Sequence, residues 1–146
     1  MSKRVPVGVG VVVIRQGQLL IGHRKGGHGA ATWALPGGWL ESDDETIEHC
    51  AMRELQEETG LVAISLRVLD LAPYKQNMDG VHSVSVYVLA NTDHSHQPEI
   101  RETDKCAEWR WVGLKSEIPA MMPLFPALKH ALSRRHVLLE AESMPE

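Results

Sequence analysis

The sequence predicts an α+β fold in which helices pack against a mixed β-sheet. Several segments are rich in β-branched residues or alternate between apolar and polar residues, and both patterns are typical of strands. Two longer segments carry apolar residues at helical spacing, and these helices do not alternate regularly with the strands. Elements of this kind bury their apolar faces in an α+β fold or in an α/β/α sandwich around a mixed sheet.

Composition is that of an ordinary globular protein. The chain has 146 residues, 43% of them hydrophobic and 23% charged, which suits a single domain over residues 1–146. Its net charge of −4 argues against a nucleic-acid duplex held by a broad basic surface. No apolar stretch is long enough to span a membrane. Two cysteines make no disulfide framework, so we expect a cytoplasmic protein with reduced thiols.

The chain begins with a predicted β-hairpin. Residues 5–14 are β-branched and should form a buried strand, residues 16–18 a turn, and residues 19–22 the returning strand. The glycine-rich, basic segment 24–32 is expected to be a loop. Residues 33–35 should form a short strand that ends at the proline after them.

A helix is predicted next. The run 42–44, Ser-Asp-Asp, is typical of a helix start, and Ser42 with Glu45 fits a capping box. Helical periodicity continues to about Thr59, and Gly60 is the expected C-terminal stop.

The second half of the chain predicts three more strands and a closing helix. The strands are expected at residues 61–71, 83–90 and 108–112, and a long polar loop at residues 91–105. The closing helix should carry Pro126 in its first turn.

The segment RELQEETG, residues 53–60, places carboxylates on the apolar side of the predicted helix. On a wheel of 100° per residue, Glu54 and Glu58 fall in the middle of the arc defined by the apolar residues Ile47, Cys50, Ala51 and Leu55. A solvated charge run would lie on the opposite side. Burying unpaired carboxylates costs on the order of several kcal/mol each, and like charges one turn apart repel.

A compensating positive charge is therefore required. A divalent cation with oxygen ligands would supply it, and Mg²⁺ prefers carboxylates together with water and substrate phosphates. A structural ion-pair network is the alternative, and Arg53 can pair with a neighbouring carboxylate and orient it. Just before the helix, Gly37-Gly38 would let backbone groups approach a metal or a phosphate closely.

These residues resemble a known motif. Residues 37–61, GGWLESDDETIEHCAMRELQEETGL, resemble the Nudix box: a glycine, five residues, Glu, seven residues, then Arg-Glu-apolar-any-Glu-Glu-any-Gly-apolar. The second half matches at every fixed position: Arg53, Glu54, Leu55, Glu57, Glu58, Gly60 and Leu61. In the first half, six residues rather than five separate Gly38 from Glu45, so one residue is inserted within ESDD. The order of elements also resembles the whole domain, and more narrowly the MutT-related diphosphatases of nucleoside triphosphates.

The resemblance implies a Nudix-type α/β/α sandwich and a hydrolase. The expected reaction converts nucleoside triphosphates, including oxidised or modified dNTPs, to the monophosphate and pyrophosphate. Mg²⁺ or Mn²⁺ would be bound by Glu54, Glu57, Glu58 and the carbonyl of Gly37, while Arg53 would hold a glutamate in place. A homodimer is also expected. The alternatives are hydrolysis of a nucleotide sugar, a dinucleoside polyphosphate or capped RNA, and a non-catalytic nucleotide-binding module.

A carboxylate must also deprotonate the attacking water. The candidates are a glutamate of the box such as Glu57, or one of two acids in the polar loop, Glu102 and Asp104. For the phosphates of the substrate, Arg24 and Lys25 are candidate ligands, the alternative being solvated turn residues.

Further residues are assigned to substrate or to core. The backbone of Gly38 would meet the substrate, and Leu124 and Phe125 could wall the base pocket, with plain core as the alternative. Trp109 and Trp111 share one side of their strand and are expected in the core or an interface. His94 and His96 lack a third ligand that a second metal site would need.

Overall fold

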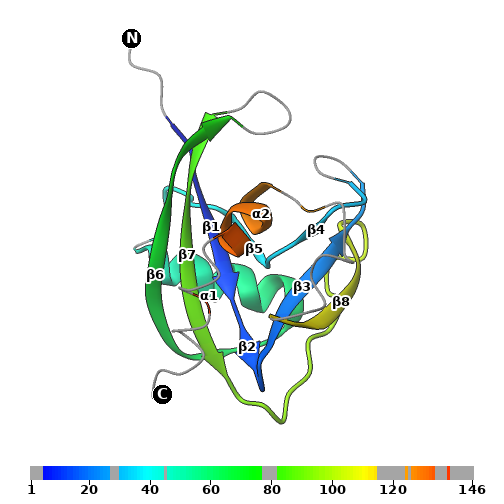
Figure 1. Cartoon of the computed structure of the whole chain (residues 1–146). Coiled ribbons are helices and arrows are strands. Elements are labelled where there is room, and N and C mark those ends of the chain that lie inside the picture. Colours follow the sequence, from blue (N-terminus) through cyan, green and yellow to red (C-terminus); the bar gives the residue numbers. More distant parts are fainter. Residues whose placement is uncertain are drawn as a thin grey trace.

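The described part of the chain folds into two four-stranded β-sheets and two helices (Figure 1). This computed structural model describes residues 5–26, 30–44, 46–76, 82–114, 124, 126–133 and 138. Among these residues, no helix has both the length and the apolar character needed to cross a membrane.

The first sheet is mixed, as the sequence predicted. Its strands lie in the order β5-β1-β7-β6. β1 runs parallel to β7, and the other pairs are antiparallel. The strands are β1 (Val7–Val12), β5 (Gly37–Trp39), β6 (Ala63–Gln76) and β7 (His82–Thr92). β5 and β6 are thus the two edge strands of this sheet.

The second sheet corrects the predicted hairpin. It contains β2 (Ile14–Arg15), β3 (Gln18–Arg24), β4 (Trp33–Ala34) and β8 (Cys106–Gly113), all paired through β3. The expected strand 5–14 is divided, because β1 joins the first sheet and only β2 pairs with the returning strand. Of the predicted strand, only Ile14 therefore lies in the strand that pairs in the hairpin.

The two helices lie on opposite sides of the first sheet, α1 behind it and α2 in front of it in Figure 1. Helix α1 (Ile47–Thr59) buries Cys50, Ala51 and Leu55 against the sheet, while α2 (Pro126–Ser133) buries Leu128 and Ala131. The prediction of an α+β fold with helices flanking a mixed sheet is confirmed.

Alternation along β1 distributes its side chains between two cores. Val9 and Val11 pack with α1, whereas Val12 packs in the other core with α2 and the second sheet. Because side chains alternate along a strand, the even-numbered residues of β1 face away from α1. Trp109 and Trp111 pack against the α1 core, as the sequence predicted.

The predicted start of α1 is wrong. The helix begins at Ile47, and the hydroxyl of Thr46 caps it by accepting the N–H of His49 at 2.9 Å. Ser42 lies in an exposed turn instead, because the carboxylate of Asp44 is held by other groups and keeps this segment outside the helix. Glu45, the second half of the expected capping box, lies outside the described residues.

The predicted end of α1 is confirmed. Gly60 adopts the left-handed conformation, with φ of 79°, and its N–H donates to the carbonyl of Gln56 at 2.9 Å. This geometry closes the last turn of the helix and is one that glycine adopts without strain.

The cap assignment makes a stability prediction. Thr46→Ala should lower the free energy of unfolding by about 1 kcal/mol, because one helix N–H loses its acceptor. Ser42→Ala, which removes the hydroxyl that the sequence favoured, should change it by less than about 0.5 kcal/mol. Urea unfolding followed by circular dichroism measures both. Equal losses for the two variants would contradict the assignment.

Candidate functional site

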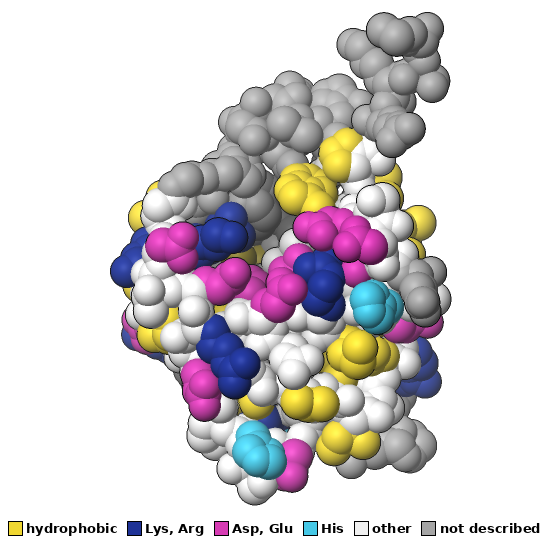
Figure 2. Space-filling view, turned by 180° about the vertical axis from the view of Figure 1, so that it is seen from behind, with side chains coloured by type: hydrophobic (Ala, Val, Ile, Leu, Met, Phe, Trp, Pro, Cys, Tyr) yellow, Lys and Arg dark blue, Asp and Glu magenta, His cyan; other side chains and the backbone are white. Residues whose placement is uncertain are grey.

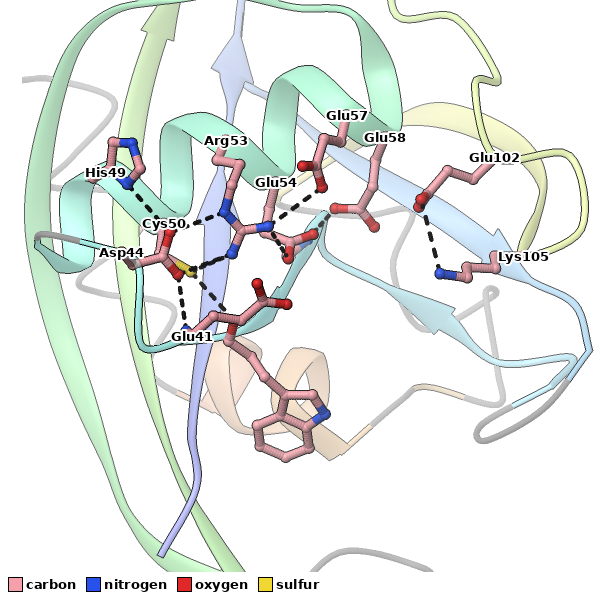
Figure 3. A network of polar contacts seen from close by, with 12 residues as sticks. Glu41, Asp44, His49, Cys50, Arg53, Glu54, Glu57, Glu58, Glu102 and Lys105 are labelled. Carbon is pink, nitrogen blue, oxygen red and sulfur yellow. Dashed lines mark hydrogen bonds and ion pairs between the residues drawn. The ribbon is translucent and has the colours of Figure 1, made fainter.

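Three glutamates, Glu54, Glu57 and Glu58, lie in the C-terminal half of α1 and line a pocket together with residues of β5 (Figure 3). The side chain of Glu54 is 14% exposed and that of Glu57 is 51% exposed. Glu58 is half-buried, and its carboxylate accepts the N–H of Gly37 at 2.8 Å. Glu54 and Glu58 therefore point toward the protein, as the wheel predicted, while Glu57 lies at the solvent edge.

The glycines of β5 allow this close approach. A Cβ atom on Gly38 would collide with the carboxylate of Glu54, and one on Gly37 would collide with the carbonyl oxygen of Val9. Gly37 also has a φ of 154°, which residues with a side chain rarely adopt. The Gly37-Gly38 pair is thus required by the packing of the acidic helix against the edge strand.

Arg53 joins the acidic residues into a network. Its Nε and Nη2 atoms donate to the two carboxylate oxygens of Asp44, each at 2.9 Å. Its Nη1 atom donates to Glu54 at 3.0 Å and to Glu57 at 3.3 Å. The expected role of Arg53 in holding a glutamate is consistent with this geometry (Figure 3).

Asp44 was missed by the sequence reasoning. Its side chain is only 2% exposed, and the hydrogen bonds from Arg53 hold the pKa of its carboxyl well below the usual range. It also accepts the N–H of Glu41 at 2.9 Å, and it lies 3.2 Å from Nδ1 of His49. The bidentate pair fixes the plane of the guanidinium group.

The position of Asp44 also locates the inserted residue. Residues 39–43, five in number, separate Gly38 from Asp44, which is the spacing that the motif gives its first acidic residue. The extra residue therefore lies between Asp44 and Arg53, just before the helix. Counting forward from the glycine, rather than backward from the arginine, is the signal that would have identified Asp44.

Burial makes the carboxylates of Glu54 and Glu58 expensive to ionise. It raises the pKa of Glu58 to about 8, an effect that the charges of Glu54 and Glu102 reinforce and the Gly37 N–H opposes. Burial also raises the pKa of Glu54, while Arg53 opposes the shift. The cluster therefore attracts positive charge or protons.

Of the two loop acids expected near the site, one lies there. Glu102 is half-buried, lines the same pocket as the α1 glutamates, and forms an ion pair of 3.8 Å with Lys105 (Figure 3). Asp104 is exposed and does not line the pocket. Lys105, which the sequence reasoning did not select, is a pocket residue.

The two basic candidates, Arg24 and Lys25, also lie in different places relative to the pocket. Arg24 lines the pocket, where its charge lowers the pKa of Glu58, and burial lowers the pKa of Arg24 itself. Lys25 is exposed outside the pocket lining. Its backbone N–H donates to the carbonyl of Lys105 at 2.9 Å, which ties the loop of Arg24 to that of Glu102.

Of the two candidates for the base pocket, only Leu124 is described, and it is not brought into the site. Leu124 is half-buried, pairs with Trp33 in an isolated bridge and packs against the core between the sheets and α2. It does not line the pocket. Phe125 lies outside the described residues.

The pocket itself has a volume of about 520 Å³, a size typical of small-molecule sites. Acidic and basic side chains meet in it, and Figure 2 shows Asp and Glu side chains gathered beside Lys and Arg across this face. Its charged lining consists of Arg24, Glu41, Arg53, Glu54, Glu57, Glu58, Glu102 and Lys105.

The donor set fits a hard divalent cation. Carboxylate oxygens are the ligands that Mg²⁺ and Mn²⁺ prefer, and burial of Glu54 and Glu58 favours a cation over solvent. In the part of the chain that the structure describes, no three acidic, His or Cys side chains already form a metal-binding cluster. Arg53 bonds one carboxylate oxygen of Glu54 and one of Glu57, which leaves the second oxygen of each to bind a cation.

Two known proteins with similar sequences carry the names of nucleotide hydrolases. The oxidized purine nucleoside triphosphate hydrolase of Danio rerio is 45% identical over 56 residues, which cover 38% of this chain and 35% of that protein. The 8-oxo-dGTP diphosphatase of Proteus vulgaris is 36% identical over 70 residues, covering 47% of this chain and 62% of that protein. The chain thus spans less than two thirds of the length of these relatives.

Solved structures share the fold. A MutT NUDIX hydrolase from Burkholderia pseudomallei superposes with a TM-score of 0.78 at 28% identity, covering 90% of this chain and 98% of that chain. A bifunctional NMN adenylyltransferase/ADP ribose pyrophosphatase from Francisella tularensis, in complex with AMP and a manganese ion, superposes with a TM-score of 0.72 at 29% identity. It covers 96% of this chain and 42% of that chain.

The family follows from the extent of the match. The family model of the NUDIX domain matches residues 4–134, which include both sheets, α1 and its acidic cluster, and α2. The polar residues of the motif, Arg53, Glu54, Glu57 and Glu58, line the pocket together with Gly37 and Gly38. The chain therefore belongs to the NUDIX family.

Proposed function

We propose that this single-domain chain is a divalent-metal-dependent pyrophosphohydrolase of nucleoside triphosphates, including oxidised or modified dNTPs. Its products would be the nucleoside monophosphate and pyrophosphate. The observation that carries the proposal is the burial of Glu54 and Glu58, one helical turn apart, at a pocket that also contains Arg24. The relatives named for oxidized purine nucleoside triphosphates and 8-oxo-dGTP support the substrate class.

The α1 carboxylates would hold the metal. Glu54, Glu57 and Glu58, with the carbonyl of Gly37, supply oxygen ligands on the side of β5 that faces α1. A bound Mg²⁺ or Mn²⁺ would neutralise charge on the phosphate oxygens and acidify a water. Without a cation, the carboxylates of Glu54 and Glu58 repel each other. Binding of a metal ion together with a phosphate would remove this repulsion.

Basic residues and amides of the pocket would bind the phosphates. Arg24 and Lys105 provide positive charge at the second sheet, across the pocket from α1. Gly38 also lines the pocket, and its backbone is a further candidate for contact with the substrate. An acidic protein needs such local positive charge to bind a triphosphate.

The general base is assigned to a carboxylate of the pocket. Glu57 and Glu102 are the candidates, because both line the pocket and neither is held by the Gly37 amide as Glu58 is. Asp104 is disfavoured by its place outside the pocket. Arg53 and Asp44 would act as positioning residues, since their bidentate pair sets the direction in which Arg53 meets Glu54 and Glu57.

A second candidate function is hydrolysis of another nucleoside diphosphate derivative. It is favoured by the similarity to the ADP ribose pyrophosphatase of Francisella tularensis. The products distinguish the two reactions. Nucleoside triphosphate hydrolysis releases pyrophosphate with a monophosphate, whereas ADP-ribose yields AMP and ribose 5-phosphate.

The first test is turnover of the purified protein with Mg²⁺ on dGTP, 8-oxo-dGTP and ADP-ribose. We expect pyrophosphate from a triphosphate, and Glu58→Gln should lower kcat/KM by at least about 100-fold because a metal ligand is lost. Glu48→Gln, at an exposed position of α1 outside the pocket lining, is the matched control and should leave turnover unchanged. Full activity of Glu58→Gln would refute the metal site.

The same variant has a stability readout that does not depend on turnover. The pKa of Glu58 is raised to about 8, so in the metal-free protein its ionisation opposes folding. Wild-type stability in EDTA should therefore fall as pH rises from the ordinary glutamate pKa through 8. Glu58→Gln should lack this fall and be the more stable protein at alkaline pH.

The Asp44–Arg53 pair makes a third prediction. Asp44→Asn should lower the free energy of unfolding at pH 7 by about 2–3 kcal/mol, because a buried partner of Arg53 is lost. The pKa of Asp44 is lowered, so its stabilisation exists at neutral pH and disappears as pH falls below the ordinary aspartate pKa. Denaturant unfolding across pH, together with kcat/KM, measures the effect.

The neighbouring acid provides the control for that variant. Asp43 is exposed, so Asp43→Asn makes the same chemical change without breaking the pair. We expect kcat/KM to fall about 10- to 100-fold for Asp44→Asn and to stay unchanged for Asp43→Asn. Equal behaviour of the two variants would contradict the positioning role.

We also propose a homodimer in the cytoplasm. Cys50 and Cys106 are free thiols, which suits a reducing compartment. Val62 is 58% exposed, Ile64 74% and Val68 44%, and the last two lie on the edge strand β6. An exposed apolar edge strand is a surface that a second copy would cover. Sedimentation velocity should show a dimer that Ile64→Glu converts to monomer, and a wild-type monomer would refute the proposal.

A further inference from the structure

A row of three residues crosses the first sheet on the side away from α1. Gly8 of β1 pairs with Trp39 of β5 on one side and with Ser85 of β7 on the other. Residues directly opposite each other in neighbouring strands present their side chains on the same face. All three residues line the pocket.

Glycine leaves the centre of this row bare. A Cβ atom on Gly8 would lie 3.6 Å from the indole ring of Trp39 and 3.7 Å from Oγ of Ser85, both ordinary contact distances. The space above Gly8 is therefore bounded by an aromatic ring and a hydroxyl group. A flat, polar-edged ring fits such a space, because it can meet the indole and form a hydrogen bond with the hydroxyl.

Trp39 itself is unusually open for so large an apolar side chain. It is 46% exposed, whereas Trp33 is 8% exposed. A single exposed apolar residue on a surface needs no explanation. Trp39, however, is exposed in the lining of the pocket that contains the acidic cluster, and there a ligand would cover it.

The edge strand β5 connects this row to the acidic cluster. Gly38 faces Glu54 on the α1 side, and the next residue, Trp39, faces the opposite side. Among the described residues, β5 is the edge strand of the first sheet, and the pocket continues around this edge from Glu54 to Gly8. A ligand with an anionic end and a flat end can occupy both sides at once.

We propose that Trp39 is the stacking platform for the base of the nucleotide, with Gly8 as the open floor and the Ser85 hydroxyl bonding the edge of the base. The inference rests on the proposed function and deepens it by assigning the base end of the substrate. Trp39 determines affinity and base preference, and the phosphate chemistry stays with α1. Purine bases, with two fused rings, gain more from the indole than pyrimidines do.

The test measures product binding, which requires no turnover. Calorimetry with dGMP, dCMP and deoxyribose 5-phosphate separates the base from the rest of the nucleotide. Trp39→Ala should weaken dGMP binding about tenfold or more, with a smaller effect on dCMP and none on deoxyribose 5-phosphate. Trp39→Phe should recover most of the affinity, because it restores an aromatic face.

Gly8→Val provides an independent variant. Its side chain would fill the floor beside Trp39 and should also lower dGMP affinity at least tenfold, with Trp39 still present. Leu71→Ala is the matched control, since Leu71 is 58% exposed but lies outside the pocket. Thermal unfolding of each variant checks that the fold is kept.

The outcomes separate this proposal from the proposed function. Wild-type affinity for dGMP in Trp39→Ala, or equal losses for dGMP and deoxyribose 5-phosphate, overturns the platform even where the wild-type protein hydrolyses triphosphates. Loss of dGMP binding in Trp39→Ala and Gly8→Val, in a protein that hydrolyses no triphosphate, keeps the platform and removes the catalytic proposal. Both proposals are supported if Trp39→Ala loses affinity for dGMP but not for deoxyribose 5-phosphate and still hydrolyses ribose 5-triphosphate.

Discussion

The site depends on two like charges buried one turn apart on α1. Glu54 and Glu58 face the sheet because the apolar residues of the same helix must be buried there, and the 3.6-residue period places the carboxylates among them. Glu58 accepts the Gly37 N–H, and Arg53 meets Glu54. These contacts offset only part of the desolvation, since the pKa of both glutamates stays raised. The remaining imbalance is the physical basis of the proposed cation site.

Close packing of that helix against β5 determines several residues around it. Gly37 and Gly38 are required because any Cβ atom would collide with a carboxylate or with β1. The same edge strand turns Trp39 to the opposite face, so one short strand separates a charged half of the pocket from an aromatic half. In the proposed binding mode, the phosphates of a nucleotide would lie in the charged half and its base in the aromatic half.

Fold class, the strands of the second half of the chain, the inward direction of Glu54 and Glu58, and the C-terminal stop at Gly60 could be read from the sequence. The division of residues 5–14 between two sheets and the edge strand β5 could not. Periodicity and residue type carry these features because they depend on neighbours within a few positions. The helix start was misjudged, because Ser42 with Glu45 fits a capping box in isolation, whereas in the folded chain Arg53 holds Asp44 and the helix begins after Thr46. Local helix propensity could not show that the Asp44 carboxylate would pair with the distant Arg53 side chain.

By itself the sequence determined which residue types α1 presents to the pocket and, through its motif, the family to which the chain belongs. Only the tertiary structure decided that Asp44 anchors Arg53, that Glu102 rather than Asp104 reaches the site, and that Arg24 rather than Lys25 lines it. It also decided that Trp39, Gly8 and Ser85 form one row. These residues lie on separate strands and loops, and no spacing along the chain records the sheet register that brings them together.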